Sequence, residues 1–182
     1  MKTSSKHRIL DGALELLRAE GGGSITLDAT ARQVGLTKPG LMYHFPTKEA
    51  LMLAVVDHVA ERWEALLRHR LGGPAETASP YQRIRTYLEV ALTERFDRAD
   101  FAIFADALYR EALTDTWKRR LAPWLALPDA LPEPARARLT AARLLADGYW
   151  TAAATGVFPV PDRDRTQLLA VAEELLKDEA PS

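Results

Sequence analysis

Hydrophobic residues recur at helical spacing along almost the whole chain. A first apolar stripe predicts a helix over residues 5–19, and three consecutive glycines at 21–23 end it. Similar stripes predict later helices at 48–70, from 79 onward, and at 97–108, 111–125, 135–155 and 162–177. No strand-like alternation, internal repeat or low-complexity tract interrupts this pattern. We therefore predict an all-α protein with about nine helices.

The most specific pattern lies between residues 26 and 48. Thr26 is a candidate N-cap for one short helix, which Gly35 ends because glycine adopts the left-handed conformation without steric cost. Thr37 is a candidate N-cap for a second short helix, in which Leu41 and Phe45 face inward. Two short helices joined by a glycine-bearing turn are typical of a helix-turn-helix, whose second helix enters the DNA major groove.

The second of these helices leaves basic, aromatic and small residues on its outer side. Lys38, Gly40, Tyr43 and His44 fall there, and such side chains suit contacts to phosphates and base edges. The alternative is an ordinary helical hairpin within a bundle, which would have the same apolar spacing. The pattern alone favours DNA binding over that alternative.

The stretch GLTKPGLMYHFPTKEAL resembles the signature of the TetR family of bacterial transcriptional regulators. The positions that match the family pattern are Thr37, Leu41, His44, Phe45 and Lys48. Pro39 stands where glycine is common, and Met42 stands where the family most often has tyrosine. We therefore assign the expected tyrosine–phosphate contact to the next residue, Tyr43.

This resemblance implies a three-helix DNA-binding domain at 1–47 and a helical effector-binding and dimerisation domain at 48–182. Helix 48–70 would connect the two domains. It also implies a regulator, commonly a repressor, that binds a pseudo-palindromic operator as a dimer and is released by a small molecule. The DNA-binding residues expected on this basis are Thr26, Thr37, Lys38, Pro39, Gly40, Tyr43, His44 and Lys48.

The last two predicted helices are candidates for a dimer interface. Residues 135–155 are rich in alanine and almost entirely apolar beyond Asp147, and 162–177 carry a wide stripe of Leu and Val. Two such helices can form a four-helix bundle with the same pair of a second subunit, which suits two-fold symmetry. Burial within a single chain is the alternative, and the resemblance favours the homodimer.

The region after residue 97 is rich in aromatic residues with a few charged neighbours. Aromatic walls with few polar groups are typical of small-molecule pockets, and an acidic residue among them favours a cationic ligand. The alternative is that these rings only fill the core. With the pocket that the resemblance implies, we expect an aromatic or cationic effector and walls formed by Phe101, Phe104, Trp117 and Trp150.

Composition narrows the remaining possibilities. Of 182 residues, 47% are hydrophobic and 27% charged, as in a globular protein, and the absence of cysteine excludes disulfides and Cys-based zinc sites. No apolar run approaches the ~18 residues of a membrane span, and Asp11 and Glu15 interrupt the first stripe, so we expect a cytoplasmic protein without a secretion signal. Net charge is −1, but Lys2, Lys6, His7 and Arg8 form a basic arm that can reach a phosphate backbone or remain solvated.

Enzymatic motifs are absent from the sequence. None of the four histidines belongs to H-E-x-x-H or lies four residues from another histidine, and no G-x-S-x-G, P-loop or dinucleotide fingerprint occurs. We therefore predict no catalytic residue, cofactor or metal. A helical adaptor, or a small all-α enzyme without DNA binding, is the competing class. Either would lack the steeply salt-dependent affinity for duplex DNA that counterion release produces.

Overall fold

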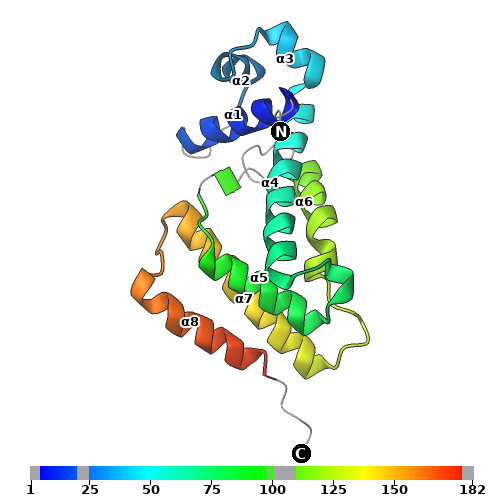
Figure 1. Ribbon diagram of the computed structural model, residues 1–182, viewed down its shortest axis with the longest axis vertical. Coiled ribbons are helices and arrows are strands. Elements are labelled where there is room, and N and C mark those ends of the chain that lie inside the picture. The colour runs from blue at the N-terminus through cyan, green and yellow to red at the C-terminus, as the bar shows by residue number, and fades with distance from the viewer. Residues whose placement is uncertain (1–4, 20–24, 98, 101–109, 178–182) are drawn as a thin grey trace, which may run out of the picture. The chain divides into compact units, whose positions relative to one another are not determined.

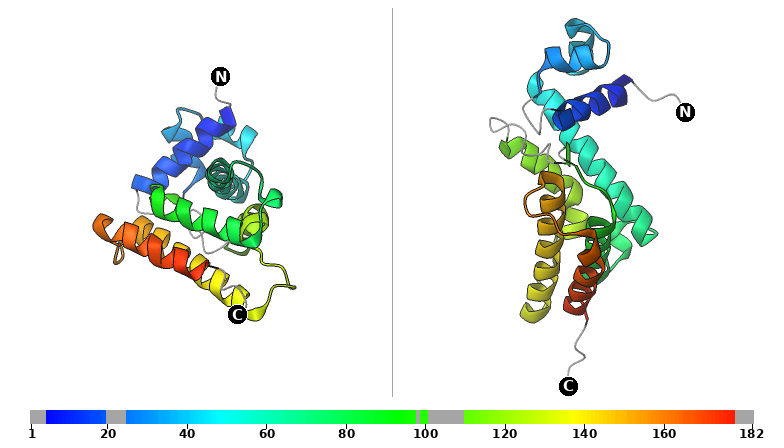
Figure 2. Two further views of the ribbon diagram at one scale, coloured as in Figure 1. Left: turned by 60° about the horizontal axis from the view of Figure 1, so that its bottom comes forward. Right: turned by 90° about the vertical axis from the view of Figure 1, so that its left-hand side faces the viewer.

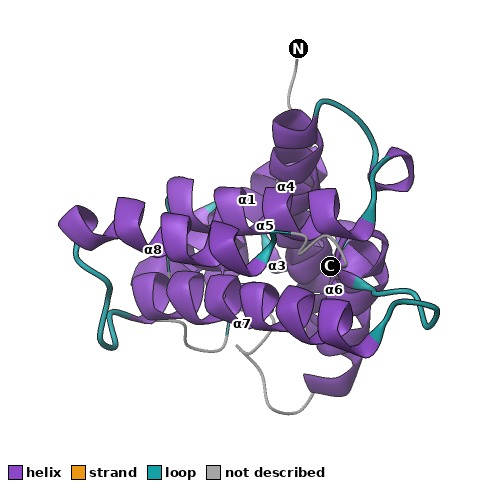
Figure 3. Cartoon of the chain, turned by 90° about the horizontal axis from the view of Figure 1, so that it is seen from below, coloured by secondary structure: helices purple, strands orange, loops and turns teal. Residues whose placement is uncertain are grey.

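The computed structural model describes residues 5–19, 25–97, 99–100 and 110–177. Within these ranges the regular elements are helices and no strand occurs, which confirms the predicted all-α class (Figures 1 and 3). The elements are α1 (Ser5–Ala19), α2 (Leu27–Gln33), α3 (Lys38–His44), α4 (Lys48–Leu71), the short 3₁₀ helix η1 (Ala75–Thr77), α5 (Pro80–Thr93), α6 (Arg110–Leu125), α7 (Glu133–Thr155) and α8 (Asp162–Leu175). The helix predicted at 97–108 lies mostly outside the described residues.

Side-chain caps fix where several helices begin. Thr47 Oγ1 accepts a hydrogen bond from the Ala50 amide at 3.0 Å, at the start of α4. A reciprocal capping box opens α5: Ser79 Oγ accepts from the Gln82 amide at 3.2 Å, and the Gln82 side chain accepts from the Ser79 amide at 2.8 Å. Each cap satisfies backbone donors that the first helical turn leaves unpaired, so these starts agree with prediction.

Helix ends depart from prediction by small amounts. Helix α6 begins at Arg110, one residue before the predicted start, and ends as predicted at Leu125, with Pro123 inside its last turn. The Arg83 guanidinium donates to the carbonyl oxygens of Pro123 and Ala126, so α5 satisfies acceptors at this end of α6. The last helix was predicted to reach Lys177, but α8 ends at Leu175.

The chain forms two compact units, and α4 and α6 each contribute to both. The first unit contains residues 1–62 and 97–120, and the second contains 63–96 and 121–182. In the first unit, α1 packs on α2 and α2 packs on α3. Gly12 permits the close approach of α1 to α2, because a Cβ at this position would lie 2.3 Å from Val34 Cγ1. The predicted division at residue 48 remains a prediction.

The second unit is built on α5, α7 and α8, which pack against one another (Figure 2). Ile84 of α5 meets Leu139 and Ala142 of α7 in a fully buried cluster, and Leu175 and Leu176 near the end of α8 pack against it. Small side chains on the inner face of α7 allow α5 to approach closely, because alanine projects little beyond the helix backbone. Among the described residues, no helix combines the length and apolar character needed to cross a bilayer.

Candidate nucleic-acid interface

The turn between α2 and α3 has the geometry that the sequence predicted. Thr26 Oγ1 accepts a hydrogen bond from the Ala29 amide at 3.1 Å, and Thr37 Oγ1 accepts from the Gly40 amide at 3.2 Å. Gly35 follows the end of α2 with a φ of +70°, a conformation that disfavours any residue with a side chain. These local interactions fix the direction in which α3 leaves the turn.

Burial separates the two faces of α3. Leu41 is completely buried and Phe45, which caps the C-terminal end of α3, is 6% exposed, so both anchor α3 to the first unit. On the opposite side Tyr43 is 87% exposed, whereas Met42 is 39% exposed. The Tyr43 ring packs edge-on against His44 with centroids 5.3 Å apart, and its contact with a phosphate remains a prediction.

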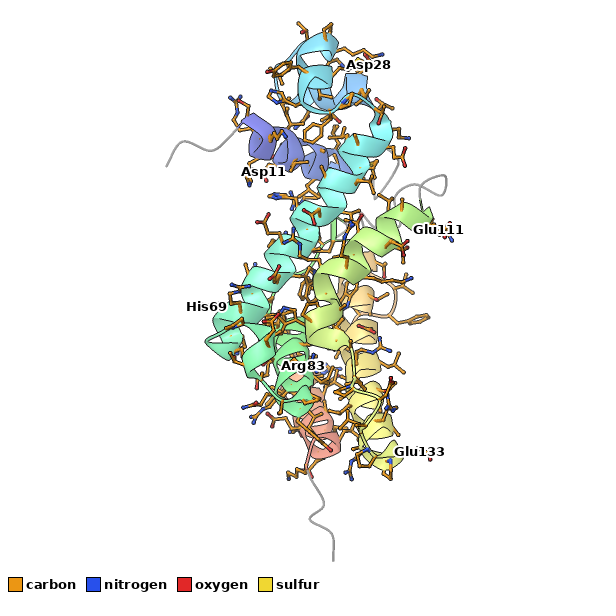
Figure 4. The ribbon with its side chains drawn as sticks, turned by 90° about the vertical axis from the view of Figure 1, so that its right-hand side faces the viewer. Asp11, Asp28, His69, Arg83, Glu111 and Glu133 are labelled. Atoms are coloured by element: carbon orange, nitrogen blue, oxygen red, sulfur yellow. The ribbon has the colours of Figure 1, made fainter. Side chains whose placement is uncertain are left out.

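Lys38 is exposed at the start of α3 but has an intramolecular partner. Its ammonium donates to Asp28 Oδ2 of α2 at 2.9 Å, and about half of each side chain remains exposed (Figure 4 labels Asp28). An exposed pair of this kind is worth at most ~1 kcal/mol, so a phosphate can compete for the lysine. The sequence pattern identified Lys38 but not its ion pair with Asp28.

The other predicted DNA-binding residues fall into two groups. Thr26, Thr37 and Pro39 are exposed, and the hydroxyls of both threonines already serve as helix caps. Gly40, His44 and Lys48 are partly buried. All six residues are therefore at least partly accessible, although their DNA contacts remain a prediction.

Arg8 of the basic arm lies close to α3, although it was not among the predicted DNA-binding residues. Arg8 of α1 and His44 of α3 line a small hollow of about 70 Å³, together with Ser5, Ile9, Val34 and Leu36. Lys6, His7 and Arg8 are all exposed. The fold thus places Arg8 near His44 at the end of α3, a neighbour that sequence spacing alone could not reveal.

A cluster of aromatic rings forms the core of the second unit. Trp63 stacks on Phe96 with ring centroids 4.4 Å apart. The ring centroids of Tyr87 and Trp150 lie 5.5 and 5.6 Å from that of Trp63. The Tyr87 hydroxyl donates to Asp147 Oδ1 at 2.6 Å, and Arg143 pairs with the other carboxylate oxygen at 2.5 Å. Burial raises the pKa of the Tyr87 phenol well above 10, and the Asp147 charge acts in the same direction.

The predicted pocket residues are only partly placed by the structure. Trp150 is 7% exposed and joins the aromatic cluster, whereas Trp117 is half-buried in the first unit. Phe101 and Phe104 lie outside the described residues. A hollow of about 300 Å³ in the second unit is lined by Tyr81, Gln82, Arg85, Glu173, Leu176 and Lys177, and so by none of the predicted walls.

The fold and the exposed recognition helix together define a helix-turn-helix transcriptional regulator. Residues 9–55 match the model for bacterial regulatory proteins of the tetR family, and residues 82–177 match the model for the tetracyclin repressor-like C-terminal domain. The chain therefore belongs to the TetR family of transcriptional regulators, as the sequence resemblance suggested.

Known proteins resemble this chain at the level of sequence or of fold. The HTH-type transcriptional regulator RutR of Escherichia coli is 34% identical over 89 residues, which cover 49% of this chain and 42% of RutR. A TetR-family regulator from Rhodococcus has the same fold, with a TM-score of 0.70 at 18% identity over 94% of this chain and 98% of its own. The multidrug binding protein EbrR in complex with ethidium has a TM-score of 0.61 at 20% identity, over 96% of this chain and all of its own.

Proposed function

We propose that this protein is a ligand-responsive repressor that binds a pseudo-palindromic operator as a dimer in the bacterial cytoplasm. The observation that carries this proposal is the capped α2–turn–α3 unit, which buries Leu41 while leaving Tyr43 and Lys38 on the outer side of α3. A short helix held in this way can enter a major groove while its polar side chains reach phosphates and base edges.

Dimerisation through α7 and α8 is the second part of the proposal. Each helix carries a large apolar side chain that the single chain leaves in solvent: Leu144 is 56% exposed and Val171 is 58% exposed. Gly148, one turn after Leu144, has no heavy atom of a neighbouring group within 4 Å of its ideal Cβ position, so a partner helix has room to approach. A two-fold dimer would present two α3 helices to half-sites about 34–36 Å apart or a multiple of this distance.

The effector is proposed to be an aromatic or cationic molecule that acts on the second domain. The aromatic cluster around Trp63 supports this chemistry, since aromatic ring faces attract flat and positively charged ligands. EbrR, which has the same fold, is described in complexes with ethidium, malachite green and proflavin. The effector would weaken operator binding, and operator binding would weaken effector binding by the same factor.

Fluorescence anisotropy tests the proposal directly. Purified protein is titrated into labelled duplex from the region upstream of its own gene at two salt concentrations, with a scrambled duplex as control. We expect selective binding by two subunits per site, with an affinity that falls steeply with salt. If the upstream duplex is not bound selectively, a selection from random-sequence duplexes follows. If that selection recovers no preferred duplex either, the repressor proposal is wrong.

A further inference from the structure

Two histidines and a glutamate meet where α1 passes α4 in the first unit. His7 comes from α1, and His58 and Glu61 come from α4. Each of the three side chains offers one ligand atom, and these atoms lie within 4.8 Å of one another. The two imidazole rings lie edge to face, with centroids 5.5 Å apart. None of these residues belongs to α3.

Helical spacing explains how these side chains come together. His58 and Glu61 are three residues apart on α4, so they lie next to each other on one face of that helix. Val55 and Val59 beside them are buried, which fixes the orientation of this part of α4. Histidine spacing within one helix does not reveal the cluster, because His7 comes from α1 and His58 from α4.

Asp11 gives His58 a defined orientation. The carboxylate oxygen Oδ1 of Asp11 lies 3.1 Å from His58 Nε2, and Figure 4 shows Asp11 on the side of α1 that faces α4. When the carboxylate accepts the Nε2 proton, Nδ1 of the same ring is unprotonated and can bind a cation. A carboxylate bonded to the second nitrogen of a metal-binding histidine is a frequent partner that fixes the tautomer and raises the basicity of the ring.

We propose that His7, His58 and Glu61 bind a divalent transition-metal ion of the zinc type, with Asp11 orienting His58. Two imidazoles and one carboxylate are ligands that Zn²⁺ accepts in four-coordinate sites, with water in the fourth position. Zinc lies about 2.0–2.2 Å from such ligands, so the three atoms must approach one another slightly. Rotations of side chains provide this movement, because His7 and Glu61 are exposed.

The bound ion would tie α1 to α4. Helix α1 and the α4 residues His58 and Glu61 all lie in the first unit, so the tie stabilises the packing of that unit. The ion also has a direct path from solvent, since two of its three ligands are exposed. This proposal concerns metal binding alone and holds whether or not the protein represses transcription.

Isothermal titration of Zn²⁺ into tag-free, full-length protein tests the proposal. We expect one ion per chain, and at least a tenfold loss of affinity in His58→Ala and in Glu61→Gln. His69→Ala is the matched control, because His69 is an exposed histidine on the same helix but outside the cluster, and it should bind like the wild type. Circular dichroism confirms that each variant is folded, and Glu61→Gln at an exposed position preserves the side-chain shape.

Cobalt substitution gives a second readout. Co²⁺ bound by two imidazoles, a carboxylate and water has visible d–d absorption bands, and we expect these bands in the wild type and in His69→Ala but not in His58→Ala. The site does not exist if the wild type binds no Zn²⁺ in the titration, or if the three variants bind it equally well.

Discussion

The indole nitrogen of Trp150 donates a hydrogen bond to the hydroxyl oxygen of Tyr87 across 3.1 Å and thereby joins α7 to α5. The same hydroxyl donates to Asp147 at 2.6 Å, so a single oxygen connects two polar groups of α7. Tyr87 is 2% exposed and Trp150 is 7% exposed. Water therefore cannot readily replace either partner, and the loss of this oxygen should be costly.

We expect Tyr87→Phe to lower the free energy of unfolding by about 1–3 kcal/mol, because it leaves the indole N–H and an Asp147 oxygen without their partner. Urea denaturation followed by circular dichroism measures the change. Tyr43→Phe is the control, since the Tyr43 side chain is 87% exposed and its hydroxyl should not affect stability. Equal stability of the two variants would show that the buried hydrogen bonds contribute nothing net.

Thr37→Ala should cost about 1 kcal/mol of stability, because it removes the oxygen that caps α3 at the Gly40 amide. It should also weaken operator binding, since the first turn of the recognition helix frays. Thr37→Ser retains the capping oxygen and should behave like the wild type in both assays. Normal DNA binding by Thr37→Ala, together with weakened binding by Thr37→Ser, would contradict the capping role.

Lys38→Ala should weaken operator binding and reduce the salt dependence by about one phosphate contact, which is a change of about 0.9 in the log–log slope. Its stability should change by no more than about 0.5 kcal/mol, since Lys38 and its partner are exposed. Anisotropy at several salt concentrations measures the slope.

The partner variant Asp28→Asn distinguishes the two roles of Lys38. If the lysine binds phosphate, removal of the competing carboxylate should maintain or raise DNA affinity. If the Lys38–Asp28 pair only positions α3 against α2, Asp28→Asn should weaken binding as much as Lys38→Ala does.

The buried carboxylate of Asp100 should give the stability a specific pH dependence. Its side chain is fully buried and accepts hydrogen bonds from Arg62 and from the Asp97 amide, the latter at 2.8 Å. Burial raises the pKa of Asp100 above 3.8, although the Arg62 charge opposes the shift. The folded state therefore holds this proton to a higher pH than the unfolded state does.

A raised pKa in the folded state means that stability is lost as pH rises. The unfolding free energy of the wild type should exceed that of Asp100→Asn most at and just above pH 3.8. This difference should fall as pH rises through the raised pKa and should be constant at higher pH. Urea denaturation from about pH 4 to about pH 7 measures it. Asp115→Asn, at an exposed site on α6, provides the reference curve. A difference that grows with pH would contradict the assigned direction.

Leu144→Arg and Val171→Arg should shift the protein from dimer to monomer, because each places a charge on a helix that the proposed interface buries. Sedimentation velocity measures the association state, and circular dichroism checks the fold. Phe158→Ser is the control: Phe158 is 94% exposed but lies in the loop between α7 and α8. Dimers that persist in both arginine variants would place the interface elsewhere.

The helices of the first unit were predictable because their signals are local. Thr26, Gly35 and Thr37 each act through contacts within a few residues, and these are the interactions that define α2, the turn and α3. The apolar pair Leu41 and Phe45 then follows from helical spacing, and both are buried. Helix starts set by capping residues agreed with the structure for the same reason.

The interactions that sequence could not reveal join distant parts of the chain. Trp63 and Phe96 are 33 positions apart and form one stack, and no periodic pattern links them. His7 and His58 are likewise brought together only by the crossing of two helices. Lys38 was identified from sequence, but its pairing with Asp28 depends on the angle between α2 and α3. Tertiary packing, rather than local propensity, decides each of these cases.

The buried aromatic residues also allow intrinsic tryptophan fluorescence to report on the second unit. Three of the four tryptophans, Trp63, Trp124 and Trp150, belong to that unit and are at most 7% exposed, whereas Trp117 belongs to the first unit. Three of the four indoles that can emit are therefore buried in the second unit. A flat aromatic compound that enters near Trp63 would quench this emission by energy transfer. Unlabelled protein and a plate reader are then sufficient to screen a compound library, without knowledge of the operator.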